Sequence, residues 1–271
     1  MKACSILIPN RWTGDAICLT IESILKRTNY PDYKIIVCDN SEGKGNTNRV
    51  EYLKEMEANG HLKLIENSIK PVNGKTPYGH GENLKVLLRD CDTPLAMLLS
   101  SGCEIKDPDW LNQLVELLDT DKYLGVAKTK AAENHFNNCW AVNRYVPNWM
   151  LLNMEIYRKF GNIDEDWELK RVPYDEYEYK YIFSSMTPPS HPDPDPIQVF
   201  LDTGWRLWDR LHYENPEKYM MADLPAHFPW RTINFFGGID RNYYRPDHPY
   251  VVKMKNGIKR NLELLRKMER Q

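Results

Sequence analysis

Three short apolar runs, at residues 5–8, 33–38 and 95–99, are each followed by residues that can bind a polar ligand. The groups involved are amides, a carboxylate, hydroxyls and a guanidinium. If the runs are parallel strands, their carboxyl ends meet at one edge of a sheet, where α/β proteins bind their ligands. The residues that follow the runs are Pro9, Asn10 and Arg11, then Asp39 and Asn40, then Ser100, Ser101 and Gly102.

A further candidate for chemistry is the carboxylate of Asp202, in the segment Asp202-Thr203-Gly204-Trp205. A carboxylate can remove the proton of a hydroxyl group as that group attacks. Asp is also a favoured helix N-cap, and we expect a helix over residues 201–211. The sequence leaves both roles of Asp202 open, as a base and as an N-cap.

Alternating strands and helices in the first half must position these residues. Besides the three runs, residues 62–65 and 124–127 read as strands. Helices are expected from near Thr13 or Asp15, over 47–58, over about 81–90, and from Asp107-Pro108 onward. This alternation predicts an α/β fold with a mostly parallel sheet and right-handed crossovers.

The second half is less regular, and we expect it to belong to the same single domain. Residues 139–146 read as extended, residues 154–160 as a short helix ended by Gly161, and residues 256–268 as a terminal amphipathic helix. Residues 188–196 include five prolines, which exclude a helix or a central strand. We therefore expect residues 187–196 to form an exposed loop, which is a candidate lid over the site.

Composition excludes several classes of protein. The 271 residues have a formal net charge of −2, without the basic excess that binding to duplex nucleic acid requires. The longest aliphatic run is residues 95–99, too short for a membrane helix, and the N-terminus lacks the pattern of a signal peptide. None of the six cysteines has zinc-site spacing, so we expect reduced thiols and a cytoplasmic location.

Five segments together resemble the GT-A glycosyltransferases of family 2. Residues 5–11 with 19–24 resemble that family's first strand and helix, and residues 36–41 resemble its second strand. Residues 80–84 and 202–205 resemble a histidine-glycine motif and an Asp-Thr-Gly segment of one branch. The resemblance implies a GT-A (Rossmann-like) fold, a nucleotide-sugar donor, and a saccharide or glycan acceptor. It divides the one domain into a donor half, 1–130, and an acceptor half, 131–271.

The segment from Leu99 to Ile105 departs from the family pattern. There the family carries an Asp-x-Asp pair that holds Mn²⁺ or Mg²⁺, whereas this chain has Ser100-Ser101-Gly102, with Glu104 as the nearest acid. Hard divalent cations need carboxylate oxygens. We therefore expect no metal site and metal-independent transfer. A site rebuilt from other groups, such as His227, stays open as the alternative, so Mn²⁺ or Mg²⁺ remains a conceivable cofactor.

The resemblance also implies roles for single residues. Asp202 is the expected catalytic base of an inverting transfer. Without a metal, cations such as Arg11, Lys85, Arg144 and Arg231 must stabilise the leaving diphosphate. His80 and His227 read equally well as ligand contacts and as packed histidines, and Trp205, Trp208 and Trp230 read more readily as core than as sugar-stacking residues. The expected donor contacts are Pro9, Asn10, Arg11, Asp39, Asn40, His80, Asn83, Lys85, Ser100, Ser101 and Gly102, and the expected phosphate or acceptor contacts are Arg144, Trp205, His227 and Arg231.

Other functions remain in competition with sugar transfer. The missing Asp-x-Asp pair favours a module that binds sugar nucleotides without turnover. A nucleotidyltransferase is a weaker alternative, because residues 10–14 are a poor version of the Gly-rich basic loop that this chemistry uses. A dehydrogenase is disfavoured because no G-x-G-x-x-G motif follows the first strand.

Overall fold

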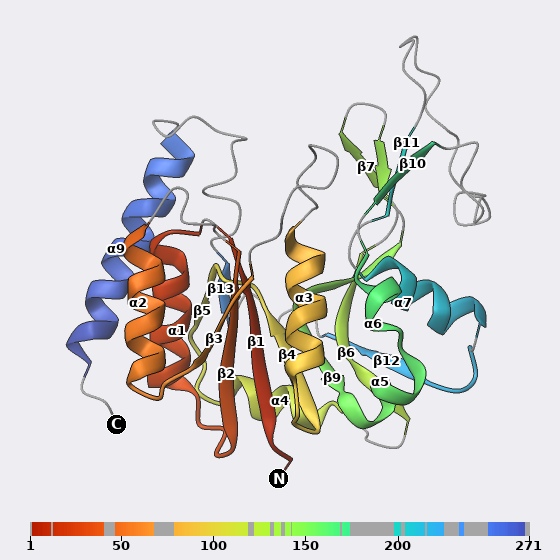
Figure 1. The fold of residues 1–271 in the computed structure, drawn as a ribbon, viewed down its shortest axis with the longest axis horizontal. Helices are drawn as coiled ribbons and strands as arrows, with labels where there is room; N and C mark the ends of the chain where they lie inside the picture. The colour runs from red at the N-terminus through yellow and green to blue at the C-terminus, as the bar shows by residue number, and fades with distance from the viewer. Residues whose placement is uncertain are drawn as a thin grey trace.

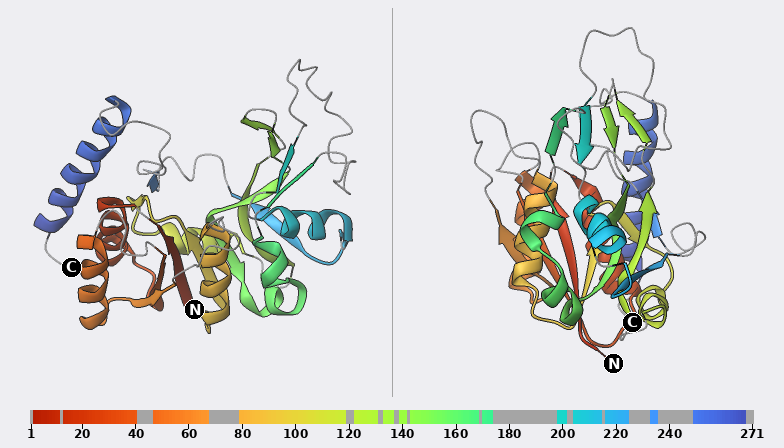
Figure 2. Two further views of the ribbon diagram at one scale, coloured as in Figure 1. Left: turned by 45° about the horizontal axis from the view of Figure 1, so that its top comes forward. Right: turned by 90° about the vertical axis from the view of Figure 1, so that its right-hand side faces the viewer.

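The central sheet of the chain is covered by helices on both sides, giving three layers (Figures 1 and 2). A mostly parallel sheet confirms the fold class expected from the alternation of strands and helices. The computed structural model describes residues 2–11, 13–40, 47–67, 79–118, 122–130, 133–136, 139–141, 143–168, 170–173, 198–201, 204–214, 216–224, 233–235 and 249–268.

Seven strands form the central sheet, in the order β12-β6-β9-β4-β1-β2-β3. Six of them share one direction, and β9 runs antiparallel to its neighbours β4 and β6. Strand β9 therefore inserts residues from the second half of the chain into the sheet that the first half begins. The strands are β1 (Cys4–Asn10), β2 (Tyr33–Asp39), β3 (Lys63–Glu66), β4 (Leu95–Leu99), β6 (Tyr123–Lys130), β9 (Arg144–Asn153) and β12 (Met220–Asp223).

One side of the sheet packs against α1 (Asp15–Arg27), α2 (Thr47–Ala58), α4 (Trp110–Glu116) and α9 (Pro249–Lys267). Apolar residues at helical spacing explain this packing, because they place one continuous face of α1 in the core, fully buried at Ile17, Ile21 and Ile24. The terminal helix begins at Pro249, seven residues before the expected start at 256. Its buried residues are Ile258, Leu262 and Leu265.

The other side packs against α3 (Gly79–Asp90), α5 (Met154–Phe160), α6 (Ile163–Asp166) and α7 (Trp205–Asp209), which continues into a π-helix, Arg210–Glu214. Helix α5 has the expected bounds. Asn153 caps it by accepting hydrogen bonds from the N–H groups of Glu155 and Ile156. Gly161 ends it with an extended backbone, and a Cβ there would lie 2.2 Å from the Tyr157 ring.

Two small sheets correct the expectations for the remaining segments. Strand β5 (Cys103–Ile105), which the sequence did not suggest, pairs with β13 (Ile233–Phe235). The second small sheet has the order β10-β11-β8-β7 and stands beyond the edge where β1 and β4 end (Figure 1). Its strands are β7 (Glu133–Phe136), β8 (Cys139–Ala141), β10 (Lys170–Pro173) and β11 (Gln198–Leu201).

The helix expected over residues 201–211 is wrong at its start. Leu201 is the last residue of β11, where it pairs with Lys170, and α7 begins only at Trp205. The extended segment expected over 139–146 is divided between β8 and the start of β9. The proline-rich residues 187–196 lie outside the described residues. Among the described helices, none combines the length and the apolar character that crossing a bilayer requires.

Candidate active site

The ends of β1 and β2 lie side by side at what we call the carboxyl edge, the edge of the sheet where β1, β2 and β4 end. Parallel pairing aligns Asn10 with Asp39. The Asn10 side-chain amide donates a hydrogen bond to Asp39 Oδ1 at 2.7 Å, and the Asn40 N–H donates to the Asn10 carbonyl at 3.1 Å. The structure thus brings together three of the expected donor contacts, Asn10, Asp39 and Asn40. A fourth, Pro9, directly precedes Asn10 in β1.

Asn83 joins helix α3 to this edge. Its Nδ2 donates to the carbonyl oxygens of Asn10 and Cys38, at 3.2 and 3.1 Å, and its Oδ1 accepts from Asn67 Nδ2 at 3.3 Å. The residue is 1% exposed. Asn83 therefore holds α3 against the ends of β1 and β2, a role that the sequence did not suggest for an expected donor contact.

Asn67 belongs to the same cluster and was not among the expected site residues. It follows β3, and its N–H donates to the Asp39 carbonyl at 2.8 Å. The signal that could have found it is the one that found Asp39 and Asn40, a polar residue directly after a strand of the parallel sheet.

Asn40 contributes a hydrogen-bond acceptor at the carboxyl edge. The residue is buried, and its Oδ1 has no hydrogen-bond partner within the part of the chain that the structure describes. Leaving a buried carbonyl oxygen unsatisfied costs about 1–3 kcal/mol. An N–H or O–H group of a ligand would remove that cost.

The segment after β4 turns sharply and is anchored to α1. The Ser100 N–H donates to the Asn148 carbonyl at 3.1 Å. Two α1 hydroxyls, Thr20 Oγ1 and Ser23 Oγ, accept from the N–H groups of Cys103 and Ile105 at 3.1 and 2.9 Å. The turn, which contains the buried residues Ser101 and Gly102, is therefore fixed at both of its ends.

The acid nearest to this turn is committed elsewhere. Glu104 is 4% exposed, its Oε1 lies 3.3 Å from Arg27 Nη1, and its Oε2 accepts from Asn261 Nδ2 at 2.8 Å. These contacts direct the carboxylate toward α1 and α9. The hydroxyls and the glycine at the end of β4 do not fit the carboxylate centre that hard divalent cations need.

No other metal centre is apparent in the described residues. They contain no group of three or more His, Cys, Asp or Glu side chains placed to hold an ion. His227, the residue named for a rebuilt site, lies outside the described residues.

The expected cations lie in different environments. Lys85 Nζ is 2.8 Å from Glu82 Oε1 within α3, and its side chain is largely buried. Arg144 is buried at the first residue of β9, opposite Lys130 at the end of β6, and therefore lies on the same side of the sheet as the carboxyl edge, beyond the end of β4. Arg11 follows β1 at the same edge. Arg231 lies outside the described residues.

The aromatic and histidine candidates also lie in different environments. Trp205 and Trp208 are buried in the apolar cluster between the sheet and α7, which is the packing role expected for them. Trp208 stacks on His212 with ring centroids 4.2 Å apart. His80 is half-buried in the first turn of α3. Trp230 lies outside the described residues.

Asp202 itself lies outside the described residues, but the start of α7 bears on one of its two roles. The N-cap position of α7 is occupied by Gly204. The alternative that Asp202 caps this helix is therefore wrong, and the role as a base stays a prediction.

The cysteines near the site are poor nucleophiles. Burial raises the pKa of Cys38 and Cys103 to about 12 from an ordinary value of 9.0, so both are thiols at neutral pH. The cysteines with described side chains are free and buried, namely Cys4, Cys18, Cys38, Cys91 and Cys103.

Known proteins resemble this chain over part of its length. The uncharacterized protein y4gI of Sinorhizobium fredii is 26% identical over 113 residues, which are 42% of this chain and 12% of that protein. TarS 1-349 of S. aureus has a TM-score of 0.41 and 12% identity, over 58% of this chain and 48% of TarS. The mannosyltransferase PcManGT of Pyrobaculum calidifontis, solved with GDP-Man and Mn²⁺, has a TM-score of 0.47 and 14% identity. The likeness covers 80% of this chain and 62% of PcManGT. The chain thus spans less than two thirds of each of these proteins.

The family comparison covers more of the chain. The model of glycosyl transferase family 2 matches residues 5–177, from β1 through the end of β10. This match extends over well more than half of the sequence, and it includes the carboxyl edge with Asn10, Asp39 and Asn83. With its mostly parallel α/β sheet of the GT-A type, the chain belongs to glycosyl transferase family 2.

Proposed function

We propose that the chain transfers a sugar from a nucleotide-sugar donor to a saccharide or glycan acceptor, inverting the anomeric carbon and working without a metal. The observation that carries the proposal is the carboxyl edge, where Asn10, Asp39 and Asn40 lie together at the ends of β1 and β2. Family membership supports the same reaction class.

Donor recognition is assigned to the ends of β1 and β2. The Asp39 carboxylate and the buried Asn40 Oδ1 can accept hydrogen bonds from N–H or O–H groups of a nucleoside. Asn83 and Asn67 hold the two strand ends in register. A preformed set of this kind binds without having to order flexible side chains first.

Metal independence rests on the chemistry of the residues after β4. Ser100, Ser101 and Gly102 provide no carboxylate, and Glu104 is held by Arg27 and Asn261. Protein cations then have to stabilise the leaving diphosphate. We assign this role to Arg11, Arg144 and Lys85, of which Lys85 must exchange its contact with Glu82 to take part.

The transfer step needs a base on the acceptor half, residues 131–271. The acceptor oxygen forms a bond to the anomeric carbon as the bond from that carbon to the diphosphate oxygen breaks. The acceptor proton passes to the Asp202 carboxylate, and the nucleotide leaves with the bonding electrons. A single displacement of this kind inverts the anomeric carbon.

A thermal-shift screen tests the donor assignment. UDP-glucose, GDP-mannose, dTDP-glucose and CMP-N-acetylneuraminate are each added with EDTA or with Mn²⁺. A ligand that binds only the folded state raises the melting temperature by mass action. We expect one donor class to stabilise the protein equally under both conditions, and the variant Asp39→Ala to lose this shift without losing its fold.

A non-catalytic module is the second candidate, favoured by the absent Asp-x-Asp pair. Release of nucleotide from the stabilising donor separates the two functions. Turnover in EDTA that Asp202→Asn abolishes supports transfer. Binding without turnover, with EDTA or with Mn²⁺, identifies the module. Because the described cysteines are buried free thiols, we place either function in a reducing compartment, the cytoplasm.

A further inference from the structure

Helix α9 stands at one end of the molecule, packed against α1 (Figures 1 and 2). The side that faces α1 is buried at Ile258, Leu262 and Leu265. Lys26 of α1 also donates a hydrogen bond from Nζ to the Leu265 carbonyl. The side facing α1 is therefore occupied, and the side turned away from α1 is the one that can meet another molecule.

The charge of α9 is opposite in sign to that of the whole chain. Its residues include six Lys or Arg and one acid, Glu263, whereas the chain has a formal net charge of −2. Lys253, Arg260 and Lys267 are exposed and follow one another at intervals of seven residues. With 3.6 residues per turn and a rise of 1.5 Å, they lie within about 40° of one another, in a line about 20 Å long. We call these three residues the basic row.

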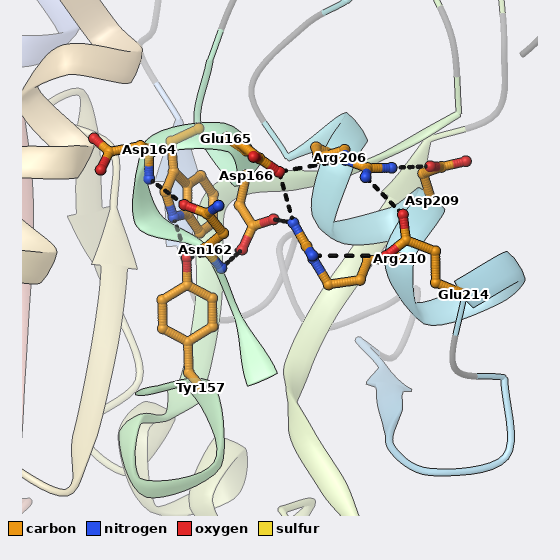
Figure 3. A network of polar contacts seen from close by, with 10 residues as sticks. Tyr157, Asn162, Asp164, Glu165, Asp166, Arg206, Asp209, Arg210 and Glu214 are labelled. Atoms are coloured by element: carbon orange, nitrogen blue, oxygen red, sulfur yellow. Dashed lines mark hydrogen bonds and ion pairs between the residues drawn. The ribbon is translucent and has the colours of Figure 1, made fainter. Parts of the chain in front are cut away.

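The basic row differs from cations elsewhere in the fold in having no acid beside it. Arg206 and Arg210, in α7 and the π-helix, share four acids between them (Figure 3). On another side of α9, Arg266 lies 3.4 Å from Glu22 of α1. Within the part of the chain that the structure describes, no residue of the basic row forms an ion pair. Its charge is therefore available to an external anion.

Apolar side chains are exposed beside the basic row. Val252 and Leu264 of α9 and Met268 directly after it are 42%, 54% and 41% exposed, which makes them three of the six large hydrophobic side chains that the described residues expose. Leu264 is four residues beyond Arg260 and three before Lys267, so it lies between these two cations on the helix surface. Cations that alternate with exposed apolar side chains are typical of segments that bind at a membrane surface.

We propose that the basic row and Leu264 dock the protein on an anionic membrane surface, with α9 lying along that surface. Lipid phosphates neutralise the three cations, and Leu264 enters the boundary between headgroups and acyl chains. Nucleic acid also attracts cations, but it offers no hydrocarbon phase to Leu264. The inference goes beyond the proposed function and does not depend on it, because it concerns where the protein is held and not what it transfers.

Co-sedimentation of the full chain with lipid vesicles tests the inference. One set of vesicles is pure phosphatidylcholine, and the other contains about 30% phosphatidylglycerol as the anionic lipid. We expect the protein to bind the anionic vesicles and not the neutral ones. Binding should weaken as the salt concentration rises, because salt screens the attraction between the basic row and the lipid phosphates.

Two variants separate the contributions of charge and of apolar insertion. The triple variant Lys253→Gln, Arg260→Gln and Lys267→Gln removes the basic row. Each cation near an anionic surface contributes about fivefold to the partition coefficient, so we expect a fall of about 100-fold. Leu264→Gln should lower the partition coefficient about threefold to tenfold and leave the preference for anionic lipid in place. These side chains are exposed, so both variants should unfold at the same urea concentration as the wild type.

A matched triple variant controls for the loss of net charge. Lys122→Gln, Lys128→Gln and Lys159→Gln also removes three exposed lysine charges, next to and within β6 and in α5. These elements pack on other parts of the sheet than α9 does (Figure 1). We expect this control to lower the partition coefficient by less than about twofold.

Three outcomes would overturn the inference. The first is binding of the wild type to neither kind of vesicle, or to both equally. The second is an equal loss of binding in the basic-row variant and in the matched control. The third is tighter binding to a short duplex DNA than to the anionic vesicles, unaffected by Leu264→Gln, which would identify a nucleic-acid surface instead.

Discussion

Neutral amides join the elements on the donor side of the site, whereas charged groups join them on the acceptor side. Asn83 binds β1, β2 and α3 together through bonds to carbonyl oxygens. Asp166 and Arg210 bind α6 to the π-helix through an ion pair that Glu165 and Glu214 extend toward solvent. The donor-side amides are buried and bind neutral carbonyl groups, while Arg210 is shared among Glu165, Asp166 and Glu214.

This difference predicts different tolerance to substitution. Removing a buried donor leaves its acceptors unsatisfied, which costs about 1–3 kcal/mol. Removing a partly exposed member of an ion-pair network costs about 0–1 kcal/mol, because water and the other charges replace it. The backbone of Gly204 is the exception on the acceptor side, because its φ of +86° favours glycine and a Cβ there would lie 2.4 Å from the Tyr145 carbonyl oxygen.

Gly204→Ala should have the largest effect on stability. It forces a side chain into a left-handed conformation and brings its Cβ within 2.4 Å of a backbone oxygen. We expect a loss of about 2–4 kcal/mol, measured by urea unfolding. Gly60→Ala is the matched control, because Gly60 has φ +73° with nothing within 4 Å of a Cβ, and it should cost only about 1 kcal/mol. Equal losses in the two variants would show that the backbone around Gly204 and Tyr145 has room to adjust.

Asn83→Ala should have the next largest effect. It leaves the Cys38 carbonyl and Asn67 without their bonds to the Asn83 side chain, so we expect a loss of about 2 kcal/mol and weaker donor binding. Asn112→Ala is the control, because the Asn112 side chain donates a 3.4 Å hydrogen bond to the exposed Asp109, and the variant should stay within about 0.5 kcal/mol of the wild type. If Asn83→Ala unfolds at the same urea concentration as the control, the amide does not hold the donor side together.

The buried thiols that flank the donor side give it a pH dependence. Burial raises the pKa of Cys38 and Cys103 above the ordinary value of 9.0, to about 12, so the folded state keeps protons that the unfolded state loses. The stability they contribute is complete below pH 9.0 and is lost as the pH rises toward 12, by at most about 1.4 kcal/mol per pH unit for each thiol.

Urea unfolding at pH 8, 9 and 10 measures this slope, and Cys103→Ala should make it shallower. A slope that Cys103→Ala leaves unchanged would contradict the assignment of the alkaline loss to that thiol.

On the acceptor side, the pH dependence of stability lies in the acid range. Burial raises the pKa of Asp166 above 3.8, and the Asn162 N–H, the Arg210 guanidinium and the Tyr157 hydroxyl partly offset this. Its contribution is therefore largest in acid and falls as the pH rises.

The sequence predicts the donor side better than the acceptor side, for a physical reason. Strands β1, β2 and β4 are continuous apolar runs that the structure buries in the core. Such signals are local. A polar residue directly after a parallel strand locates the carboxyl edge, and this pattern can be recognised without knowing any contact between residues far apart in the chain.

The errors come from contacts between residues far apart in the chain. Leu201 continues a helical spacing into α7, yet its pairing with β10 makes it a strand residue. Glu104 lies beside the expected metal position, and its partners Arg27 and Asn261 are 77 and 157 residues away. Asp166 shows no motif at all, because its role depends on where Arg210 comes to lie.

The smallest expected effect is that of a chelator, which should change turnover by less than about twofold. The reason lies in the composition of the donor side, where Ser100 and Gly102 replace two carboxylates and Glu104 is neutralised by Arg27. Ser100→Asp with Gly102→Asp provides the converse, since paired carboxylates at the end of β4 should make donor binding depend on Mn²⁺. Calorimetry of the selected donor in EDTA and in Mn²⁺ measures both proteins. Loss of wild-type binding in EDTA, restored by Mn²⁺, would mean that a metal ion and not Arg11 or Arg144 faces the diphosphate.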